Sequence, residues 1–227
     1  LRESPVWKII LKSLLDKNFI VAGVEYRFTD DNTKFPAHLI DCKDAVRWIR
    51  KNSPQYDIDP DRISVWGASA GGHLALMVAL KADNVFVGDR ELAPFSSSVR
   101  NVVSWFGPTD FTSWIKETTQ QFIKDEVSYL FGGSLDEVPD RYINASPIIY
   151  LKKESVPVLL IHGLKDEAVP FSQSRMLYEY GLEIGANIEL IEVENAGHGP
   201  LEFEKEDSLP CLDETLKRMI EFILAYT

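Results

Sequence analysis

The sequence predicts an α/β fold, in which a mostly parallel sheet carries helices on both faces. Short apolar stretches of strand length alternate along the chain with segments whose apolar residues recur at the helical period. Residues 157–163 form an almost continuous apolar run, which is typical of a strand buried on both faces. The 227 residues contain no linker and no internal repeat, so we expect residues 1–227 to form a single domain.

Two helices and two strands are expected before residue 67. Apolar side chains at Leu39, Cys42 and Val46 follow the helical period, which indicates an amphipathic helix. In chain order we expect a helix capped by Ser4 and ending near residue 18, a strand over 20–26, a helix over 37–51 and a strand over 62–66.

The later elements continue the alternation, with one interruption. In chain order we expect a helix ending near residue 81, strands over 99–106 and 157–163, a helix around 177–184, a strand over 188–193 and a terminal helix around 212–223. Residues 107–150 show no clean strand period and contain one plausible helix, near 118–130. We interpret this segment as a short, cap-like insertion.

Composition argues against several classes of function. The net charge of −11 argues against binding nucleic acid or an anionic membrane through a basic face. No apolar run approaches the roughly 20 residues that cross a bilayer, so we expect no membrane span. Cys42 and Cys211 each fall in an apolar helical stripe, which favours buried free thiols over a disulfide. No signal peptide is visible, yet compartment and oligomeric state stay undetermined; for a soluble chain we slightly favour the cytoplasm over secretion.

The stretch 62–77 is organised around Ser69. An apolar strand, a turn of small residues and an apolar helix follow one another, which is the pattern of a nucleophile elbow. Because the residues two before and two after the serine come into near contact in such a turn, we expect Gly67 and Gly71 to be required there. The free N–H groups of the following helix would face an anion beside the Ser69 hydroxyl. Taken alone, the pattern also fits a glycine-rich turn with a surface serine.

Four histidines are candidates for the base that a serine nucleophile needs. His198 lies in a loop of small residues just past the last expected strand, where its side chain can reach over the sheet edge toward Ser69. We therefore expect His198 to be the base. A structural role is favoured for the other three, which are His38, His73 and His162.

An acid that orients the histidine is expected at the end of another strand. Asp166 follows the strand over 157–163, one loop before the strand that precedes His198. Glu167 is its main competitor and Asp110 is the second. The order serine, acid, histidine is the one expected for a nucleophile elbow of this type.

Three motifs together resemble the α/β-hydrolase superfamily. They are Gly-Ala-Ser-Ala-Gly-Gly-His-Leu-Ala at 67–75, His-Gly-Leu-Lys-Asp-Glu-Ala-Val-Pro at 162–170 and Ala-Gly-His-Gly at 196–199. Within the superfamily, the chain is similar to the esterase and lipase group related to hormone-sensitive lipase and to bacterial feruloyl and acetylxylan esterases. The resemblance spans nearly the whole chain, and it implies Ser69 as nucleophile, Asp166 as acid and His198 as base.

The chain departs from that group at its N-terminal side. Members carry a His-Gly-Gly-Gly type loop before the first helix, whose backbone N–H groups form half of the oxyanion hole. Nothing replaces it here, so the N–H of Ala70 is the only oxyanion donor that we assign. In that group the same region also includes the strand that lies, in the sheet, between those expected over 20–26 and 62–66, so we expect N-terminal strands to be missing from the chain as given. We expect the natural protein to have a longer N-terminus; otherwise the strands re-pair or borrow a neighbour's strand.

Aromatic residues of the cap-like segment bear on the substrate. Five are candidates to line an acyl or aryl pocket, although packing onto the sheet is favoured for most of them: Phe111, Trp114, Phe122, Tyr129 and Phe131. The segment is short, which favours small or accessible esters over long-chain lipids.

We expect a serine carboxylester hydrolase that cleaves acetyl, short acyl or feruloyl esters through an acyl-enzyme intermediate. Its expected partner is a small-molecule ester, and no metal or organic cofactor is needed. One alternative is a serine peptidase of the prolyl-oligopeptidase type, for which an aromatic residue after the serine would be expected instead of Ala70. Another is a non-catalytic binding protein on a hydrolase scaffold; such proteins usually lose a triad member, and this chain keeps all three.

Overall fold

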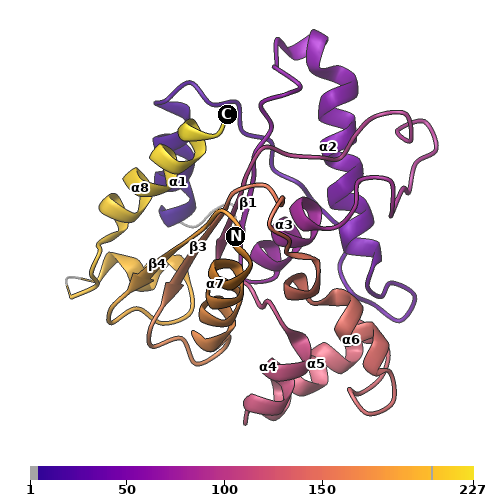
Figure 1. The fold of residues 1–227 in the computed structure, drawn as a ribbon, viewed down its shortest axis with the longest axis vertical. Helices are drawn as coiled ribbons and strands as arrows, with labels where there is room; N and C mark the ends of the chain where they lie inside the picture. Colours follow the sequence, from indigo (N-terminus) through magenta and orange to yellow (C-terminus); the bar gives the residue numbers. More distant parts are fainter. Residues whose placement is uncertain (1–4, 206) are drawn as a thin grey trace.

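The computed structural model describes residues 5–205 and 207–227, and its centre is a parallel sheet (Figure 1). Its strands are β1 (Val65–Ala68), β2 (Val102–Trp105), β3 (Val158–Gly163) and β4 (Ile188–Val193). They lie side by side in chain order, each parallel to the next. Ala68 pairs with Trp105 and Trp105 with Ile161, so the carboxyl ends of these strands meet at one edge of the sheet. The predicted α/β fold is confirmed.

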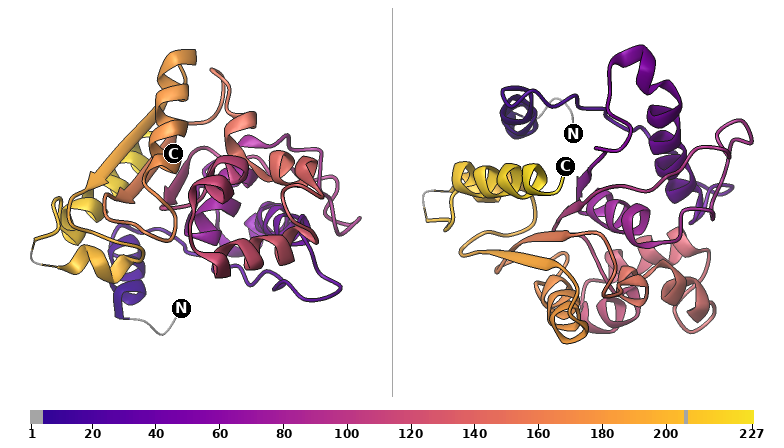
Figure 2. Two further views of the ribbon diagram at one scale, coloured as in Figure 1. Left: turned by 90° about the horizontal axis from the view of Figure 1, so that it is seen from below. Right: turned by 45° about the horizontal axis from the view of Figure 1, so that its top comes forward.

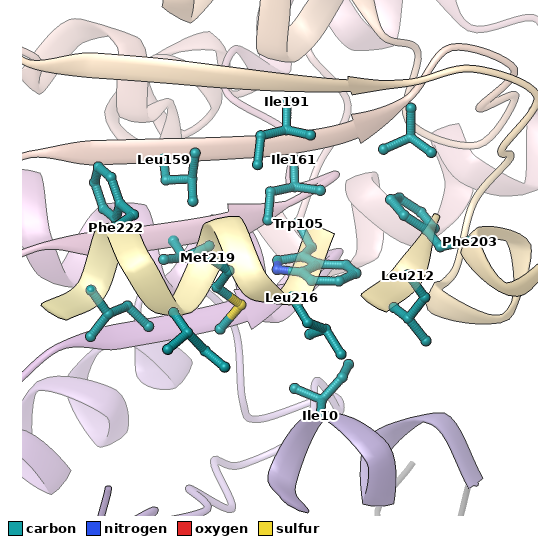
Figure 3. Packing of buried hydrophobic residues seen from close by; sticks show 14 of the residues in the cluster. Ile10, Trp105, Leu159, Ile161, Ile191, Phe203, Leu212, Leu216, Met219 and Phe222 are labelled. Atoms are coloured by element: carbon teal, nitrogen blue, oxygen red, sulfur yellow. The ribbon is translucent and has the colours of Figure 1, made fainter. Parts of the chain in front are cut away.

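The two terminal helices cover one face of the sheet. They are α1 (Pro5–Leu15) and α8 (Leu212–Ala225), which lie side by side (Figure 2). Under α8, Leu216 and Met219 pack on Trp105 and Ile161 of the strands, and all four side chains are buried (Figure 3). Each such side chain contributes about 1.5–3 kcal/mol when it leaves water, so this cluster fixes both helices to the sheet. Ser4, the predicted cap of the first helix, lies outside the described residues.

Two helices cover the opposite face, α3 (Ala70–Leu80) and α7 (Ser172–Ile184). Leu76 and Leu177 of these helices pack on Val102 and Leu160 of the strands. A short 3₁₀ helix (Pro200–Glu204) follows β4 and leads toward α8.

Helix α2 (Ala37–Tyr56) packs on the outer side of α3 and runs beyond its predicted end at residue 51. Pro54 lies inside its last turn and has no N–H for the carbonyl oxygen of Arg50. The hydroxyl of Ser53 donates to that oxygen instead, at 3.0 Å. The helix ends at Asp57, which adopts the left-handed conformation with φ 53°.

Residues 107–150 form more helices than the one predicted. They are α4 (Phe111–Glu117), α5 (Gln121–Phe131), α6 (Pro139–Ala145) and a 3₁₀ helix (Pro147–Tyr150). Seven-residue helices such as α4 and α6 are too short to show a clear apolar period in the sequence. The rings of Phe111 and Phe131 pack edge to face with centroids 5.0 Å apart, at the centre of a small apolar core shared by α4, α5 and α6.

The predicted strand over 20–26 is wrong for this structure. A strand requires a ladder of backbone hydrogen bonds to a neighbour. None of the four strands pairs with residues 20–26 in the described part of the chain, and Ile20 and Val24 are exposed. An apolar run is a local feature of the sequence, whereas a strand also needs a neighbouring strand to pair with. This segment is instead an irregular connection between α1 and α2.

The two cysteines are free, as predicted, but Cys42 is only partly buried. Cys211 is exposed, because it precedes α8 at the N-cap position and does not join the buried stripe of that helix. Among the described residues, no helix combines the length and the apolar character that crossing a membrane requires.

Candidate active site

Ser69 occupies a sharp turn between β1 and α3. Its backbone has φ 54° and ψ −122°, a conformation that a residue with a side chain rarely adopts. Two hydrogen bonds hold it there: its N–H donates to the carbonyl oxygen of Trp105 at 2.9 Å, and its own carbonyl oxygen accepts from the N–H of His73 at 3.0 Å. The turn thus presents the serine side chain at the carboxyl edge of the sheet.

The glycines of this turn are required at positions partly different from those predicted. A Cβ on Gly67 would lie 2.3 Å from the carbonyl oxygen of Gly71, so Gly67 must be glycine. A Cβ on Gly71 would meet nothing within 4 Å, and the prediction for that residue is wrong. The second position without space is Gly72, where a Cβ would lie 2.8 Å from Oγ of Ser104. The side of α3 that faces β2 determines which glycine lacks space for a side chain. The sequence pattern of the turn does not show which side that is.

Ser69, His198 and Asp166 lie together in one line of hydrogen bonds. Oγ of Ser69 is 2.9 Å from Nε2 of His198, and Nδ1 of His198 is 2.7 Å from Oδ2 of Asp166. The three residues follow β1, β4 and β3, so they are brought together by the parallel strands and not by proximity in sequence. With the proton on Nδ1, the imidazole donates to the carboxylate and Nε2 is free to accept the hydroxyl proton of Ser69.

Asp166 is surrounded by donors. Its Oδ1 accepts the N–H groups of Ala168 and Val169, both at 2.9 Å, and its side chain is fully buried. Burial raises the pKa of this carboxyl group, but hydrogen bonds from His162 and His198 outweigh burial, so the net effect is a lowered pKa. The carboxylate is therefore ionised at neutral pH.

The two competing acids lie elsewhere. Glu167 is exposed to solvent. The carboxylate of Asp110 is engaged at the start of α4, where it accepts the N–H groups of Thr112 and Ser113. Neither carboxylate is bonded to His198 in the structure.

Phe106 is a site residue that the sequence analysis missed. It directly follows β2, is buried, and has φ 41°, which is rare for a bulky residue. Its ring meets the imidazole of His198 at an interplanar angle of 62°, with centroids 4.8 Å apart. The signal in the sequence was only its place at a strand end, which it shares with several residues.

The other histidines have hydrogen-bond partners away from Ser69. His73 is buried against the rings of Phe35 and Phe111, and its Nε2–H donates to the carbonyl oxygen of Ala145 at 2.8 Å. Burial lowers the pKa of His73 to about 4, so this ring is neutral at physiological pH. His38 pairs with the hydroxyl of Thr29 at 3.0 Å, and burial lowers its pKa as well. His162 is bonded inside the loop that holds Asp166.

A cavity of about 470 Å³ opens beside Ser69 and Ala70. Apolar side chains that line it include Phe111 and Trp114 of α4, Val127 and Leu130 of α5, and Val169 from the loop after β3. Of the five aromatic candidates, Phe111, Trp114 and Tyr129 line it. Phe122 does not and is 59 % exposed, while Phe131 is buried in the core shared by α4, α5 and α6.

Ala70 is the first residue of α3, and it is exposed toward this cavity. N–H groups in the first turn of a helix have no partner within the helix, so that of Ala70 is available to an oxyanion beside Ser69. Residues 5–205 and 207–227 contain no cluster of three or more histidine, cysteine or acidic side chains that could hold a metal ion.

Comparison with known proteins places the chain in a family. Residues 2–180 match the family model BD-FAE, which is well over half of the chain. The chain belongs to the BD-FAE family. Among curated relatives, Esterase LipQ of Mycobacterium tuberculosis is 31 % identical over 83 % of this chain and 44 % of its own length. The chain spans less than half the length of the curated mycobacterial esterases it matches.

Solved structures share the fold of this chain. A truncated carbohydrate esterase from gut microbiota has a TM-score of 0.83 at 28 % identity, covering 96 % of this chain and 77 % of that one. A bifunctional GH43-CE protein of Bacteroides eggerthii has a TM-score of 0.84 at 34 % identity, covering 97 % of this chain and 31 % of that one. The predicted resemblance to α/β-hydrolases of the esterase group is confirmed.

Proposed function

We propose that this chain is the catalytic part of a serine carboxylester hydrolase. The observation that carries the proposal is the unbroken line of hydrogen bonds from Ser69 through His198 to Asp166, beside an apolar cavity. The esterases among its relatives support it. We further propose that residues 1–227 act as one domain in which residues 107–150 form a short cap over the cavity.

Acylation begins at Ser69. Nε2 of His198 takes the hydroxyl proton while Oγ attacks the ester carbonyl carbon, and the carbonyl oxygen becomes an oxyanion. The N–H of Ala70, at the positive end of α3, stabilises that charge. The imidazolium then gives its proton to the leaving alcohol oxygen, the tetrahedral intermediate collapses, and the acyl group stays on Ser69.

Deacylation repeats the sequence with water. Nε2 of His198 takes a proton from a water molecule, whose oxygen attacks the acyl carbon, and returns the proton to Oγ of Ser69 as the carboxylic acid leaves. Asp166 stays ionised throughout and holds the imidazole with Nδ1 toward Oδ2. No metal or organic cofactor takes part.

The substrate is a small or accessible ester of acetyl, short acyl or feruloyl type. The apolar wall formed by Trp114 and Val127 suits the acyl or aryl group, and the short segment over the cavity favours small or accessible esters over long-chain lipids. The carbohydrate esterase among the structural neighbours favours a sugar as the alcohol part.

Hydrolysis of p-nitrophenyl acetate tests the proposal. Ser69→Ala should abolish turnover. Asp166→Asn should lower kcat by on the order of 10⁴, because the imidazole of His198 is no longer held in the tautomer that carries its proton on Nδ1. Glu167→Gln is the matched control, since that carboxylate is exposed, and should leave kcat unchanged. Circular dichroism confirms that each variant is folded.

Two outcomes would replace the proposal. Cleavage of a proline p-nitroanilide without cleavage of any ester would indicate a peptidase of the prolyl-oligopeptidase type. Failure of a fluorophosphonate to label Ser69 in the folded protein would indicate a non-catalytic binding protein.

A further inference from the structure

A second histidine contacts the acid of the triad. Nε2 of His162 lies 3.3 Å from Oδ2 of Asp166, the same oxygen that accepts from Nδ1 of His198. It also lies 2.9 Å from the carbonyl oxygen of Val169. The side chain is fully buried at the end of β3, and nothing in the mechanism above uses it.

The surroundings of His162 determine which nitrogen carries its proton. Nε2 faces two oxygen acceptors, so it must be the N–H donor. Nδ1 lies 2.7 Å from the hydroxyl of Ser174, which donates to it. A neutral imidazole therefore satisfies every contact. The rings of Phe106 and Phe171 pack edge to face on it, with centroids at 6.4 Å and 5.8 Å, and restrict its rotation.

Without His162, only one oxygen of Asp166 would be held by groups outside the triad. The N–H groups of Ala168 and Val169 both bind Oδ1, so the carboxylate could still turn about this oxygen and move Oδ2 away from His198. Nε2 of His162 makes its shorter hydrogen bond to the Val169 carbonyl oxygen, at 2.9 Å, and at 3.3 Å it is also close enough to Oδ2 to restrict this rotation. The lowered pKa of Asp166 has the same origin, because the hydrogen bonds of His162 and His198 outweigh its burial.

We propose that His162 is a positioning residue of the reaction: its Nε2–H holds Oδ2 of Asp166 where Nδ1–H of His198 needs it. This inference rests on the proposed esterase function. It predicts that loss of the donor slows the chemical step while substrate binding is retained, because His162 lies behind the acid and does not line the cavity.

A purely structural role makes a different prediction. The bond from His162 to the Val169 carbonyl oxygen shapes the loop after β3, and the Val169 side chain lines the cavity. If that were its whole contribution, substitution would raise KM and lower the melting temperature, and kcat would follow the folded fraction.

The matched pair is His162→Gln and His162→Asn. The glutamine amide nitrogen can take the place of Nε2 while its oxygen accepts from Ser174, whereas the shorter asparagine reaches only Ser174. His162→Asn should lower kcat by roughly 10–100-fold with KM within about twofold, as expected for losing one hydrogen bond to a charged group. His162→Gln should recover most of kcat. Ser174→Ala, which removes a buried bond of the same network without touching Asp166, should keep kcat within about threefold.

Two results on p-nitrophenyl acetate overturn the inference. One is a His162→Asn variant with wild-type kcat. The other is an equal loss in the glutamine and asparagine variants that tracks KM or the melting temperature.

A measurement independent of turnover separates this inference from the proposed function. The proton on Nδ1 of His198 gives a downfield NMR resonance while it is bonded to Asp166. It should be sharp in the wild type and in His162→Gln, and broadened or lost in His162→Asn. Loss in His162→Gln, or no change in His162→Asn, overturns the inference. An inactive wild type with a sharp resonance refutes only the esterase proposal.

Discussion

At the scale of the residue, the site depends on side chains that are held in a single protonation state. Asp166 is kept charged by its donors, and His73 is kept neutral by burial between Phe35 and Phe111. His73 lines the same cavity as Ser69 and is close to it in sequence, but its Nε2–H donates to the carbonyl oxygen of Ala145. Burial and this hydrogen bond together leave His73 neutral, with its N–H directed away from Ser69.

The neutral state of His73 makes stability depend on pH. Its pKa is about 4 in the folded chain and 6.5 when unperturbed, so between these values the unfolded chain binds the extra proton. The free energy of unfolding should therefore fall as pH drops from about 6.5 to 4, by up to about 3 kcal/mol from this residue. Urea unfolding across this range measures the loss.

The comparison variant for that experiment is His73→Gln, whose amide can still donate to the Ala145 carbonyl oxygen but does not titrate. Its stability should depend less steeply on pH than that of the wild type over the same range. Identical slopes would show that the pH dependence comes from other groups.

At the scale of the element, the turn at Ser69 depends on how closely α3 packs against β2. The helix approaches the strand so closely that a Cβ on Gly72 would also lie 3.0 Å from the carbonyl oxygen of Trp105 and 3.2 Å from Cα of Gly107. This approach lets the carbonyl oxygen of Trp105 accept the N–H of Ser69. Contact between these two elements, and not the turn alone, sets the position of Ser69.

Neighbouring glycines of α3 should therefore respond in opposite ways to alanine. Gly72→Ala should lower the free energy of unfolding by about 1–3 kcal/mol, because the Cβ overlaps β2. Gly71→Ala has open space and should be neutral or stabilising by up to about 1 kcal/mol, because alanine is the better helix former. The melting temperatures of the two variants, measured by thermal unfolding, test this expectation. Equal melting temperatures would contradict the close packing of α3 on β2.

At the scale of the whole molecule, the loop after β3, which carries Asp166, is hydrogen-bonded to residues of the α4–α5 region beside the cavity. Nε1 of Trp114 in α4 donates to the carbonyl oxygen of Ala168 at 3.0 Å, and Nε2 of Gln120 donates to that of Glu167 at 2.6 Å. The loop after β3 thus joins these helices to Asp166, and through Val169 the same loop contributes to the cavity wall.

Acyl-chain preference should depend on Trp114. Trp114→Phe removes volume from the cavity wall, and each further methylene that it lets the substrate bury contributes about 0.8 kcal/mol. The kcat/KM for p-nitrophenyl octanoate relative to acetate should rise several-fold. Phe122→Leu, an exposed aromatic of the same segment, should leave this ratio unchanged. An unchanged ratio in Trp114→Phe would place the acyl group elsewhere.

The sequence by itself determined the features that depend on neighbours along the chain. The strand and helix on either side of Ser69, the strand ends before Asp166 and His198, and their order all follow from local patterns, because periodicity and turn chemistry act over a few residues. These patterns were enough to predict the parallel α/β fold and to select the three residues that lie together in it.

Only the tertiary structure decided what depends on residues distant in sequence. The strand over 20–26 lacks a pairing partner among the described residues, although its composition suits a strand. Gly72 replaces Gly71 as the second position without space for a side chain, because β2 passes beside it. Phe106 and His162 meet His198 and Asp166 only after the strands align. Packing and hydrogen bonding act through space, so no pattern along the chain contains them.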